Sequence, residues 1–356
     1  MSFSNEIRIG TKLVSSSEPV FLIAEISANH NNDLNRTRKI IKEAAINGAD
    51  AVKFQTYTAD TITLNSNRPE FLIEGGLWDG RTLYDIYQEG SLPWEWHSEL
   101  FDYARSLGLA VISSPFDESA VDFLLSEGVD ALKIASFEVN HIPLIRKAAS
   151  TGLPLIISTG MATDEEVLEV LNVLKEHQCT DLVLLHCISS YPALPEDYNL
   201  KSIQFLSDTF NSLVGLSDHC TDNLAAAASV SLGATVIEKH FTLSRDNGGL
   251  DDSFSLEPGG LSELRKNCDI ISAAMKWNGF GCGVTESKSR SFRRSIYASA
   301  DIKKGERFTE QNIRVVRPAL GLHPRNYSDI LNREATRDIH FAEPITEKDF
   351  SHEVLP

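Results

Sequence analysis

The segment "PLIISTGMATDEEVLEVLNVLKEHQCTDLVLLHC" (154–187) contains one complete unit of the pattern that decides the fold. An apolar run at 154–160 precedes a segment whose apolar residues lie three and four positions apart, and a second apolar run follows at 181–187. Continuous apolar runs are typical of parallel strands covered on both faces, whereas the three-and-four spacing is typical of an amphipathic helix. Thr163 and Glu166 have the spacing of a capping box that begins such a helix. The segment therefore predicts a strand, a helix and a second, parallel strand.

The same unit recurs along most of the chain. Apolar runs lie at 19–27, 50–56, 109–115, 130–136, 154–160, 181–187, 213–218 and 234–240. Eight strand-then-helix units over about 240 residues are typical of a (β/α)8 barrel, which is an α/β fold. The segment 57–96 after the second run is too long for a plain connection, and loops of such length are usually functional.

The composition changes after the last predicted helix. Residues 278–295 are rich in glycine, serine and basic residues, and the following segments have short strand-like runs separated by turns. We expect a barrel domain at 1–280, a linker at 281–295 and a small second domain at 296–356.

Charge and hydropathy limit the classes of partner. The 356 residues carry a formal net charge of −17, which would repel nucleic acids and anionic membrane surfaces. No apolar run approaches the roughly 18 residues needed to cross a bilayer, and the polar first residues lack a secretion signal. The five cysteines have no CxxC spacing, which predicts reduced thiols. We therefore expect a cytoplasmic protein with no nucleic-acid or membrane partner.

Polar residues stand at the end of every predicted strand, whereas the strands begin with apolar residues. The C-terminal strand ends build the active site of a (β/α)8 barrel. The residues at these ends are Glu25, Lys53, Gln55, Ser113, Ser114, Lys133, Ser136, Ser158, Thr159, His186, Ser217, His219, Glu238 and His240. Burying unpaired charge costs several kcal/mol, so their shared placement predicts one functional cavity rather than separate structural ion pairs.

The cations and hydroxyls in this set suit an anionic ligand. Ammonium groups and hydroxyls together hold a phosphate, the first by charge and the second by hydrogen bonds. The candidates are Lys53, Lys133, Ser136, Ser158, Ser189 and Ser217. Each serine taken alone is equally well explained as a helix cap.

Two histidines, His219 and His240, follow adjacent predicted strands. Two neutral imidazoles in one cavity suit a divalent transition metal with open positions for water or substrate. Carboxylates at the same end act as a general base or hold sugar hydroxyls, and the candidates are Glu25, Glu238 and either Asp251 or Asp252. The alternative for Glu238 is an ion pair with Lys239 that braces the barrel end.

These segments, in this order, resemble the sialic acid synthase family, whose members condense phosphoenolpyruvate (PEP) with sugars to make nonulosonic acids. The matching segments are "AEISANHN" (24–31), "ADAVKFQTYTADTI" (49–62), "SSPFD" (113–117), "LKIASFE" (132–138), "ISTGMAT" (157–163), "HCISSYP" (186–192), "VGLSDH" (214–219) and "IEKHFTL" (237–243). Residues 302–324, "IKKGERFTEQNIRVVRPALGLHP", resemble the family's antifreeze-protein-like (SAF) domain. The resemblance implies a (β/α)8 barrel, a small C-terminal SAF domain, and a homodimer in which each small domain covers the partner's barrel.

The resemblance also implies residue roles. His219 and His240 match manganese ligands, with Mg²⁺ or Co²⁺ as alternative metals. The positions that match PEP ligands are Lys53, Lys133, Ser136, Ser158, Ser189, Ser217 and Lys239. The positions that match sugar-binding or catalytic residues are Glu25, Gln55, Glu138, Tyr191, Asp251 and Arg317, the last reaching the partner's barrel. Many sialic acid synthases carry asparagine in place of Ser189, and Asp252 is a rival to Asp251.

The insert at 64–101 resembles the branch of the family that makes pseudaminic acid. That branch implies a PEP-dependent, carbon–carbon bond-forming transferase acting on 2,4-diacetamido-2,4,6-trideoxy-β-L-altropyranose. A 6-deoxy sugar has a methyl group, so we expect an apolar wall from Phe71, Leu77 or Trp78. The alternatives are an N-acetylneuraminate or legionaminic acid synthase, using N-acetylmannosamine or 2,4-diacetamido-2,4,6-trideoxy-mannose, a pyruvate aldolase, and a non-catalytic sugar-sensing or ice-binding protein.

Overall fold

The computed structural model describes residues 2–276, 279–281 and 283–351. The chain divides into two compact units, and the boundary between them follows Lys276. Parts of each predicted segment lie outside the described residues: 1 and 277–278 of the barrel domain, Cys282 of the linker and 352–356 of the second domain.

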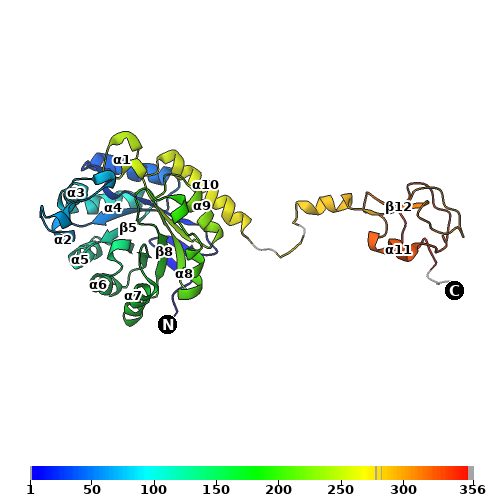
Figure 1. The fold of residues 1–356 in the computed structure, drawn as a ribbon, viewed down its shortest axis with the longest axis horizontal. Coiled ribbons are helices and arrows are strands. Elements are labelled where there is room, and N and C mark those ends of the chain that lie inside the picture. Colours follow the sequence, from blue (N-terminus) through cyan, green and yellow to red (C-terminus); the bar gives the residue numbers. More distant parts are fainter. Residues whose placement is uncertain (1, 277–278, 282, 352–356) are drawn as a thin grey trace. The chain divides into compact units, whose positions relative to one another are not determined.

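Eight parallel strands close into a barrel in the first unit, which confirms the predicted (β/α)8 fold (Figure 1). Going round the barrel, the order is β10-β3-β4-β5-β6-β7-β8-β9. The strands are β3 (Phe21–Glu25), β4 (Ala51–Thr56), β5 (Ala110–Pro115), β6 (Ala131–Ile134), β7 (Leu155–Ser158), β8 (Leu182–Cys187), β9 (Leu213–Asp218) and β10 (Val236–His240). Sequential strands are neighbours throughout, as right-handed crossovers through helices produce.

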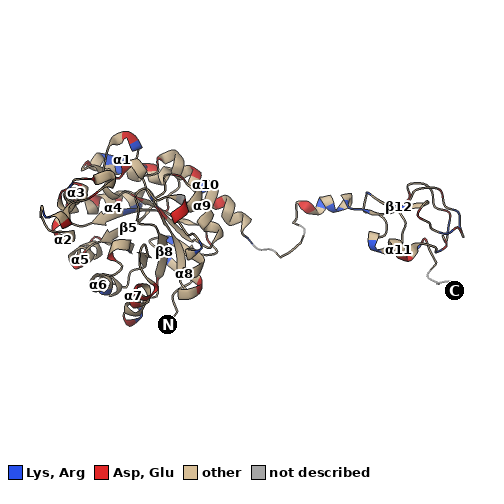
Figure 2. Ribbon diagram, viewed as in Figure 1, with Lys and Arg blue, Asp and Glu red and all other residues tan. Residues whose placement is uncertain are grey.

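Each barrel strand is followed by a helix on the outside of the barrel. The helices are α1 (Leu34–Ile46), α4 (His97–Ser106), α5 (Glu118–Ser126), α6 (Ile142–Ala149), α7 (Asp164–Glu176), α8 (Ser202–Phe210), α9 (Leu224–Ser231) and α10 (Pro258–Ala274). The predicted capping box is present at α7, where the Thr163 hydroxyl accepts from the Glu166 amide and the Glu166 carboxylate accepts from the Thr163 amide. Acidic and basic residues are interspersed over these helices (Figure 2).

The strands alternate between two cores. On β10, Val236 belongs to the cluster inside the barrel, whereas Ile237 belongs to the cluster between strands and helices. Because side chains alternate along a strand, Glu238 and His240 follow Val236 inward and Lys239 follows Ile237 outward. Both faces are buried, which is why the sequence of each strand is continuously apolar rather than alternating.

A short hairpin of β1 (Glu6–Ile9) and β2 (Lys12–Ser15) closes one end of the barrel. Its residues Ile7, Ile9 and Val14 join the interior cluster that contains Phe21 and Ala51, near the beginnings of β3 and β4. The N-terminal end is therefore plugged with apolar side chains, and the opposite end is free to form a site.

The long segment between β4 and α4 contains α2 (Ala59–Ile62) and α3 (Leu83–Gly90). A bridge between Leu72 and Thr82 folds the segment back on itself. The Trp78 indole donates to the Leu250 carbonyl at 3.3 Å, which ties the insert to the loop that follows β10.

The second unit is small and has little helix, with strands β11 (Ser295–Ala298) and β12 (Ile313–Val316) and the short helix α11 (Tyr327–Ile330). Its core is separate and contains Ile296, Phe308 and Ile345. The segment predicted as a linker includes a 3₁₀ helix at Glu286–Phe292. The four described cysteines are free thiols, and no helix in the described ranges is long and apolar enough to span a bilayer.

Candidate active site

Two lysines and two glutamates form a buried ion network inside the C-terminal end of the barrel. The Lys53 ammonium lies 2.7 Å from Glu25 Oε2 and 3.4 Å from Glu238 Oε1, and Lys133 lies 3.4 Å from the same Glu238 oxygen. Burial lowers the pKa of Lys53, but the carboxylates of Glu238 and Glu25 outweigh burial and raise it overall. Burial prevails at Lys133 and lowers its pKa. Both cations therefore pair with Oε1 of Glu238, whose Oε2 has no hydrogen-bond partner among the described residues, and both lie where they can bind an incoming anion.

Hydroxyl groups from neighbouring strand ends lie beside these cations. The Ser217 hydroxyl donates to Glu238 Oε1 at 3.4 Å, and the hydroxyls of Ser136 and Ser189 are 2.7 Å apart. Ser158 Oγ, at the end of β7, is buried and has no hydrogen-bond partner among the described residues. Gly160 has a φ of +49°, and a Cβ there would lie 2.4 Å from the Ser136 Cβ, so only glycine fits between these strand ends. The set can hold the oxygens of a phosphate.

The two predicted metal ligands face one another. The rings of His219 and His240 have centroids 5.4 Å apart, and the Tyr191 ring lies 4.3 Å from the first and 5.9 Å from the second. His219 Nδ1 donates to the Ile188 carbonyl at 2.8 Å, and the His219 side chain also hydrogen-bonds with Cys187. Burial lowers the pKa of His219, but the contact with Cys187 outweighs burial and raises it overall. Burial first, and then nearby positive charge, keeps the pKa of His240 well below its ordinary value, so the ring is neutral.

This pair fits a divalent metal, although no group of three or more potential ligands occurs in the described part of the chain. His240 Nδ1 is buried without a hydrogen-bond partner in the described ranges, and Asp251 Oδ2 lies 3.9 Å from it. A metal site with few protein ligands needs ring nitrogens such as His240 Nδ1, which has no hydrogen-bond partner in the described ranges, beside a second imidazole, that of His219. Catalytic metals keep positions open for water or substrate in this way.

Asp251, not Asp252, lies on the wall of the cavity. The Ser27 hydroxyl donates to Asp251 Oδ2 at 2.5 Å, and Gln55 Nε2 donates both to Ser27 Oγ and to Glu25 Oε1 at 2.9 Å. Asp252 instead pairs with Arg36 at 3.1 Å and accepts from the Gly249 amide at 2.7 Å. Its carboxylate is therefore occupied in holding the loop that follows β10.

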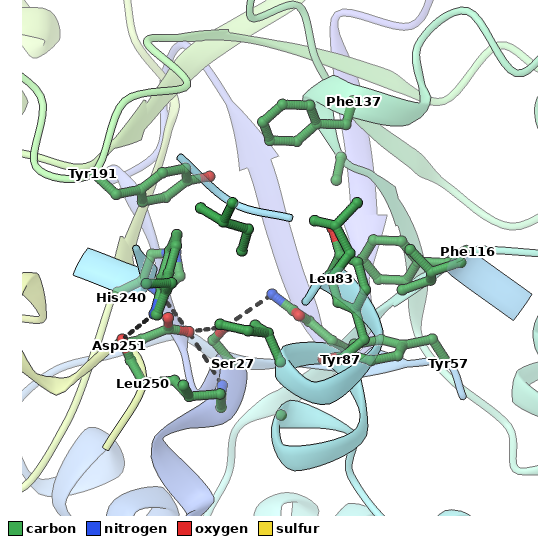
Figure 3. Close-up of a pocket in the computed structure, with 18 of the residues that line it drawn as sticks. Ser27, Tyr57, Leu83, Tyr87, Phe116, Phe137, Tyr191, His240, Leu250 and Asp251 are labelled. Carbon is green, nitrogen blue, oxygen red and sulfur yellow. Dashed lines mark hydrogen bonds and ion pairs between the residues drawn. The ribbon is translucent and has the colours of Figure 1, made fainter. Parts of the chain in front are cut away.

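A cavity of about 410 Å³ opens above these groups. Figure 3 shows Ser27, His240 and Asp251 together on one side, and Tyr57, Phe116 and Tyr87 on the other. The insert supplies Ile62, Ile73, Trp78, Leu83, Ile86 and Tyr87. Of the three residues expected on an apolar wall, Trp78 belongs to it, whereas Phe71 and Leu77 do not. The sequence did not predict the remaining lining residues of the insert, because residue spacing in an irregular segment does not indicate which side chains turn inward.

Glu138 and Tyr191 also line the cavity. Glu138 Oε2 is buried without a hydrogen-bond partner in the described residues. Burial raises the pKa of Glu138 to about 7, although Lys133 pulls it down. A carboxyl group with such a pKa can accept or donate a proton near neutral pH.

Two side chains at the strand ends, those of Lys239 and His186, do not reach the cavity. Lys239 points outward and binds Asp218 at 2.6 Å, so the structure does not bring its ammonium together with Lys53 and Lys133. His186 also lies on the outer face, where Nε2 contacts the Tyr198 carbonyl. Arg317 is exposed on the second unit. The inward set is Glu25, Lys53, Gln55, Ser114, Lys133, Ser158, Ser217, His219, Glu238 and His240, with Ser136, Glu138, Ser189, Tyr191 and Asp251 from the loops.

Comparisons with known proteins identify the family of each unit. Residues 40–278 match the model of the NeuB family, and residues 293–351 match the SAF domain. The chain is 46% identical to the pseudaminic acid synthase of Campylobacter jejuni subsp. jejuni serotype O:23/36 (strain 81-176), covering 93% of this chain and 96% of that protein. It is 38% identical to the N,N'-diacetyllegionaminic acid synthase of C. jejuni serotype O:2, covering 92% and 98%.

A solved structure supports the same relationship. The crystal structure of N-acetylneuraminic acid (sialic acid) synthetase from Leptospira borgpetersenii serovar Hardjo-bovis, in complex with citrate, matches with a TM-score of 0.72 and 30% identity. The match covers 81% of this chain and 96% of that one. The sialic acid synthase resemblance of the motifs is confirmed: with its family match, its relatives and its closed barrel, this chain belongs to the NeuB family.

Proposed function

We propose that this chain condenses PEP with 2,4-diacetamido-2,4,6-trideoxy-β-L-altropyranose and water, and releases pseudaminic acid and phosphate. One observation carries the proposal. A single barrel end joins a cationic, hydroxyl-lined region at Lys133 and Ser158 to a pair of imidazoles, and an apolar wall stands opposite. The choice of sugar is supported by 46% identity to a pseudaminic acid synthase, against 38% to a legionaminic acid synthase.

PEP is the ligand for the cationic region. Its phosphate and carboxylate need positive charge that the net charge of −17 does not provide on average. Lys53 and Lys133 offer ammonium donors whose charge Glu25 and Glu238 balance in the absence of ligand, and the hydroxyls of Ser136, Ser158 and Ser189 supply further donors. Fixed donors in a buried site stabilise charge more than water does because they need not reorganise.

His219 and His240 would hold the metal, which we propose to be Mn²⁺, with Mg²⁺ or Co²⁺ as alternatives. When bound there, the cation supplies a Lewis acid for the aldehyde oxygen of the open-chain sugar. Asp251, held by Ser27, and Gln55 lie beside His240 and orient the sugar hydroxyls.

The carboxyl groups of Glu25 and Glu138 act at C2 of PEP. C3 of PEP forms the new bond to the sugar C1, so positive charge develops at C2, and water adds there before the C–O bond to phosphate breaks. Glu25, held by Lys53 and Gln55, places negative charge beside this region. Burial outweighs Lys53 and raises the pKa of Glu25, so this carboxyl can also take the proton of the incoming water. Glu138 is the second candidate for that proton transfer, since burial raises its pKa to about 7.

The apolar wall favours a 6-deoxy, diacetamido sugar over N-acetylmannosamine, and the legionaminic acid precursor has the same methyl groups. The substrate has a 6-methyl group and two acetamido methyl groups, where N-acetylmannosamine has a 6-hydroxyl and one acetamido group. Ile73, Trp78 and Ile86 can bury such methyl groups, and each buried methyl favours binding by about 0.8 kcal/mol. We also propose the swapped homodimer, in which Arg317 of one subunit contacts sugar in the partner's barrel.

Phosphate release with three sugars tests the proposal. The protein is incubated with PEP, Mn²⁺ and the altropyranose substrate, the legionaminic acid precursor or N-acetylmannosamine, each with and without chelator. We expect chelator-sensitive phosphate release that is fastest with the altropyranose. A preference for N-acetylmannosamine would refute the choice of sugar, and turnover of pyruvate without phosphate release would indicate an aldolase.

A further inference from the structure

Lys239 forms a buried cross-strand pair on the outer face of the barrel. Lys239 on β10 and Asp218 on β9 are direct partners in the strand register, and their charged atoms lie 2.6 Å apart. Both side chains are almost completely buried. The pair therefore sits behind the barrel wall, one residue from each histidine and on the opposite face of the strands.

The Lys239 ammonium also closes the turn that carries His219. It donates to the carbonyl of Cys220 at 2.8 Å and to the carbonyl of Asp222 at 2.6 Å. Its three hydrogen bonds thus bind the chain on both sides of His219, from the end of β9 to the approach to α9. No donor of this ammonium remains for a substrate, since an ammonium has three.

A second set of contacts holds the His219 backbone itself. The Tyr198 hydroxyl donates to Asp218, and it accepts from the amides of His219 at 3.1 Å and Cys220 at 2.9 Å. The His219 carbonyl accepts from the Ala193 amide at 3.2 Å. His219 Nδ1 is also held, by the Ile188 carbonyl. Hydrogen bonds therefore fix the His219 backbone and one ring nitrogen, and together they set the direction of Nε2.

We propose that Lys239, acting with Asp218 and Tyr198, is a positioning residue that sets the aim of His219 Nε2 toward the metal, and that it is not a ligand of PEP. The inference rests on the metal-dependent function proposed above. Hydrogen-bonded partners behind metal ligands are worth about 10–100-fold in metal affinity in other proteins. The same loss is expected here when the brace is removed.

Lys239→Met and a matched control, Arg265→Met, test the role. Arg265 also binds two carbonyls, those of Gly48 at 2.9 Å and Val20 at 2.7 Å, and the carboxylates of Asp50 and, at 3.7 Å, Asp269, but near the N-terminal strand ends. Mn²⁺ affinity is measured on the full-length protein without substrates, from the free Mn²⁺ signal in electron paramagnetic resonance. We expect affinity to fall about 10–100-fold in Lys239→Met and to stay within about twofold of wild type in Arg265→Met.

Tyr198→Phe keeps the shape of the core and removes one oxygen. It therefore provides a second test of the positioning role if Lys239→Met does not fold. It should weaken Mn²⁺ binding while kcat at saturating Mn²⁺ stays near the wild-type value. Unchanged Mn²⁺ affinity in a folded Lys239→Met or Tyr198→Phe would overturn the inference. So would an increased KM for PEP in Lys239→Met with intact Mn²⁺ binding, because that result would mark a direct PEP ligand. A protein that binds Mn²⁺ but releases no phosphate would refute the proposed function and leave the positioning role standing.

Discussion

Replacing Glu138 with glutamine removes a buried carboxyl group while keeping the size of the side chain. Glu138 lines the cavity, and burial raises its pKa from the ordinary value of 4.5 to about 7. A group whose pKa is higher in the folded protein stabilises the fold fully below the unfolded pKa. That stability is lost as the pH rises through the folded pKa.

The size of the effect follows from the difference between the two pKa values. At about 1.4 kcal/mol for each pH unit, the rise from 4.5 to about 7 corresponds to about 3 kcal/mol of unfolding free energy. Most of this, about 2 to 3 kcal/mol, is lost between pH 5 and pH 8.5. Glutamine does not titrate, so Glu138→Gln should gain stability relative to wild type across that interval.

Urea unfolding at a series of pH values measures this difference. Fluorescence of Trp78, Trp94 and Trp96 follows the barrel unit, which contains all three. Glu176→Gln, at the exposed end of α7, controls for the loss of one negative charge. Parallel stability curves for wild type and Glu138→Gln would refute the view that burial raises the pKa of this carboxyl group, and would weaken its case as a proton-transfer residue.

Three further changes test the assigned roles. His240→Ala should lower Mn²⁺ content and rate together, whereas His177→Ala should not; normal metal content in His240→Ala would remove it from the ligand set. Lys133→Met should raise the KM for PEP about 10–100-fold and leave that for sugar unchanged, since a charged hydrogen bond contributes about 1.5–3 kcal/mol; the exposed-face Lys147→Met is the control. Arg317→Ala should impair sugar use more than its control, Arg314→Ala. If the subunits share sites, mixing Arg317→Ala protein with Glu25→Ala protein should restore activity. No recovery would argue against a swapped dimer.

The barrel and the end at which its chemistry lies could be predicted from the residues alone. Eight apolar runs alternate with helix patterns, and each run finishes in polar groups, so the C-terminal strand ends could be read without a structure. The motifs around His219 and His240 then predicted the family, which the family match confirms.

The direction in which each of these side chains points depends on how the chain packs in three dimensions. The two-residue period of a strand places Lys239 on the opposite face from Glu238 and His240, but in a strand buried on both faces polarity does not mark which face is inward. Asp251 was separated from Asp252 by partners far away in the chain, Ser27 and Arg36. The apolar wall of Ile73 and Ile86 depends on how an irregular insert folds over the barrel. Orientation and long-range contacts arise from packing, which residue spacing along a single strand or loop does not encode.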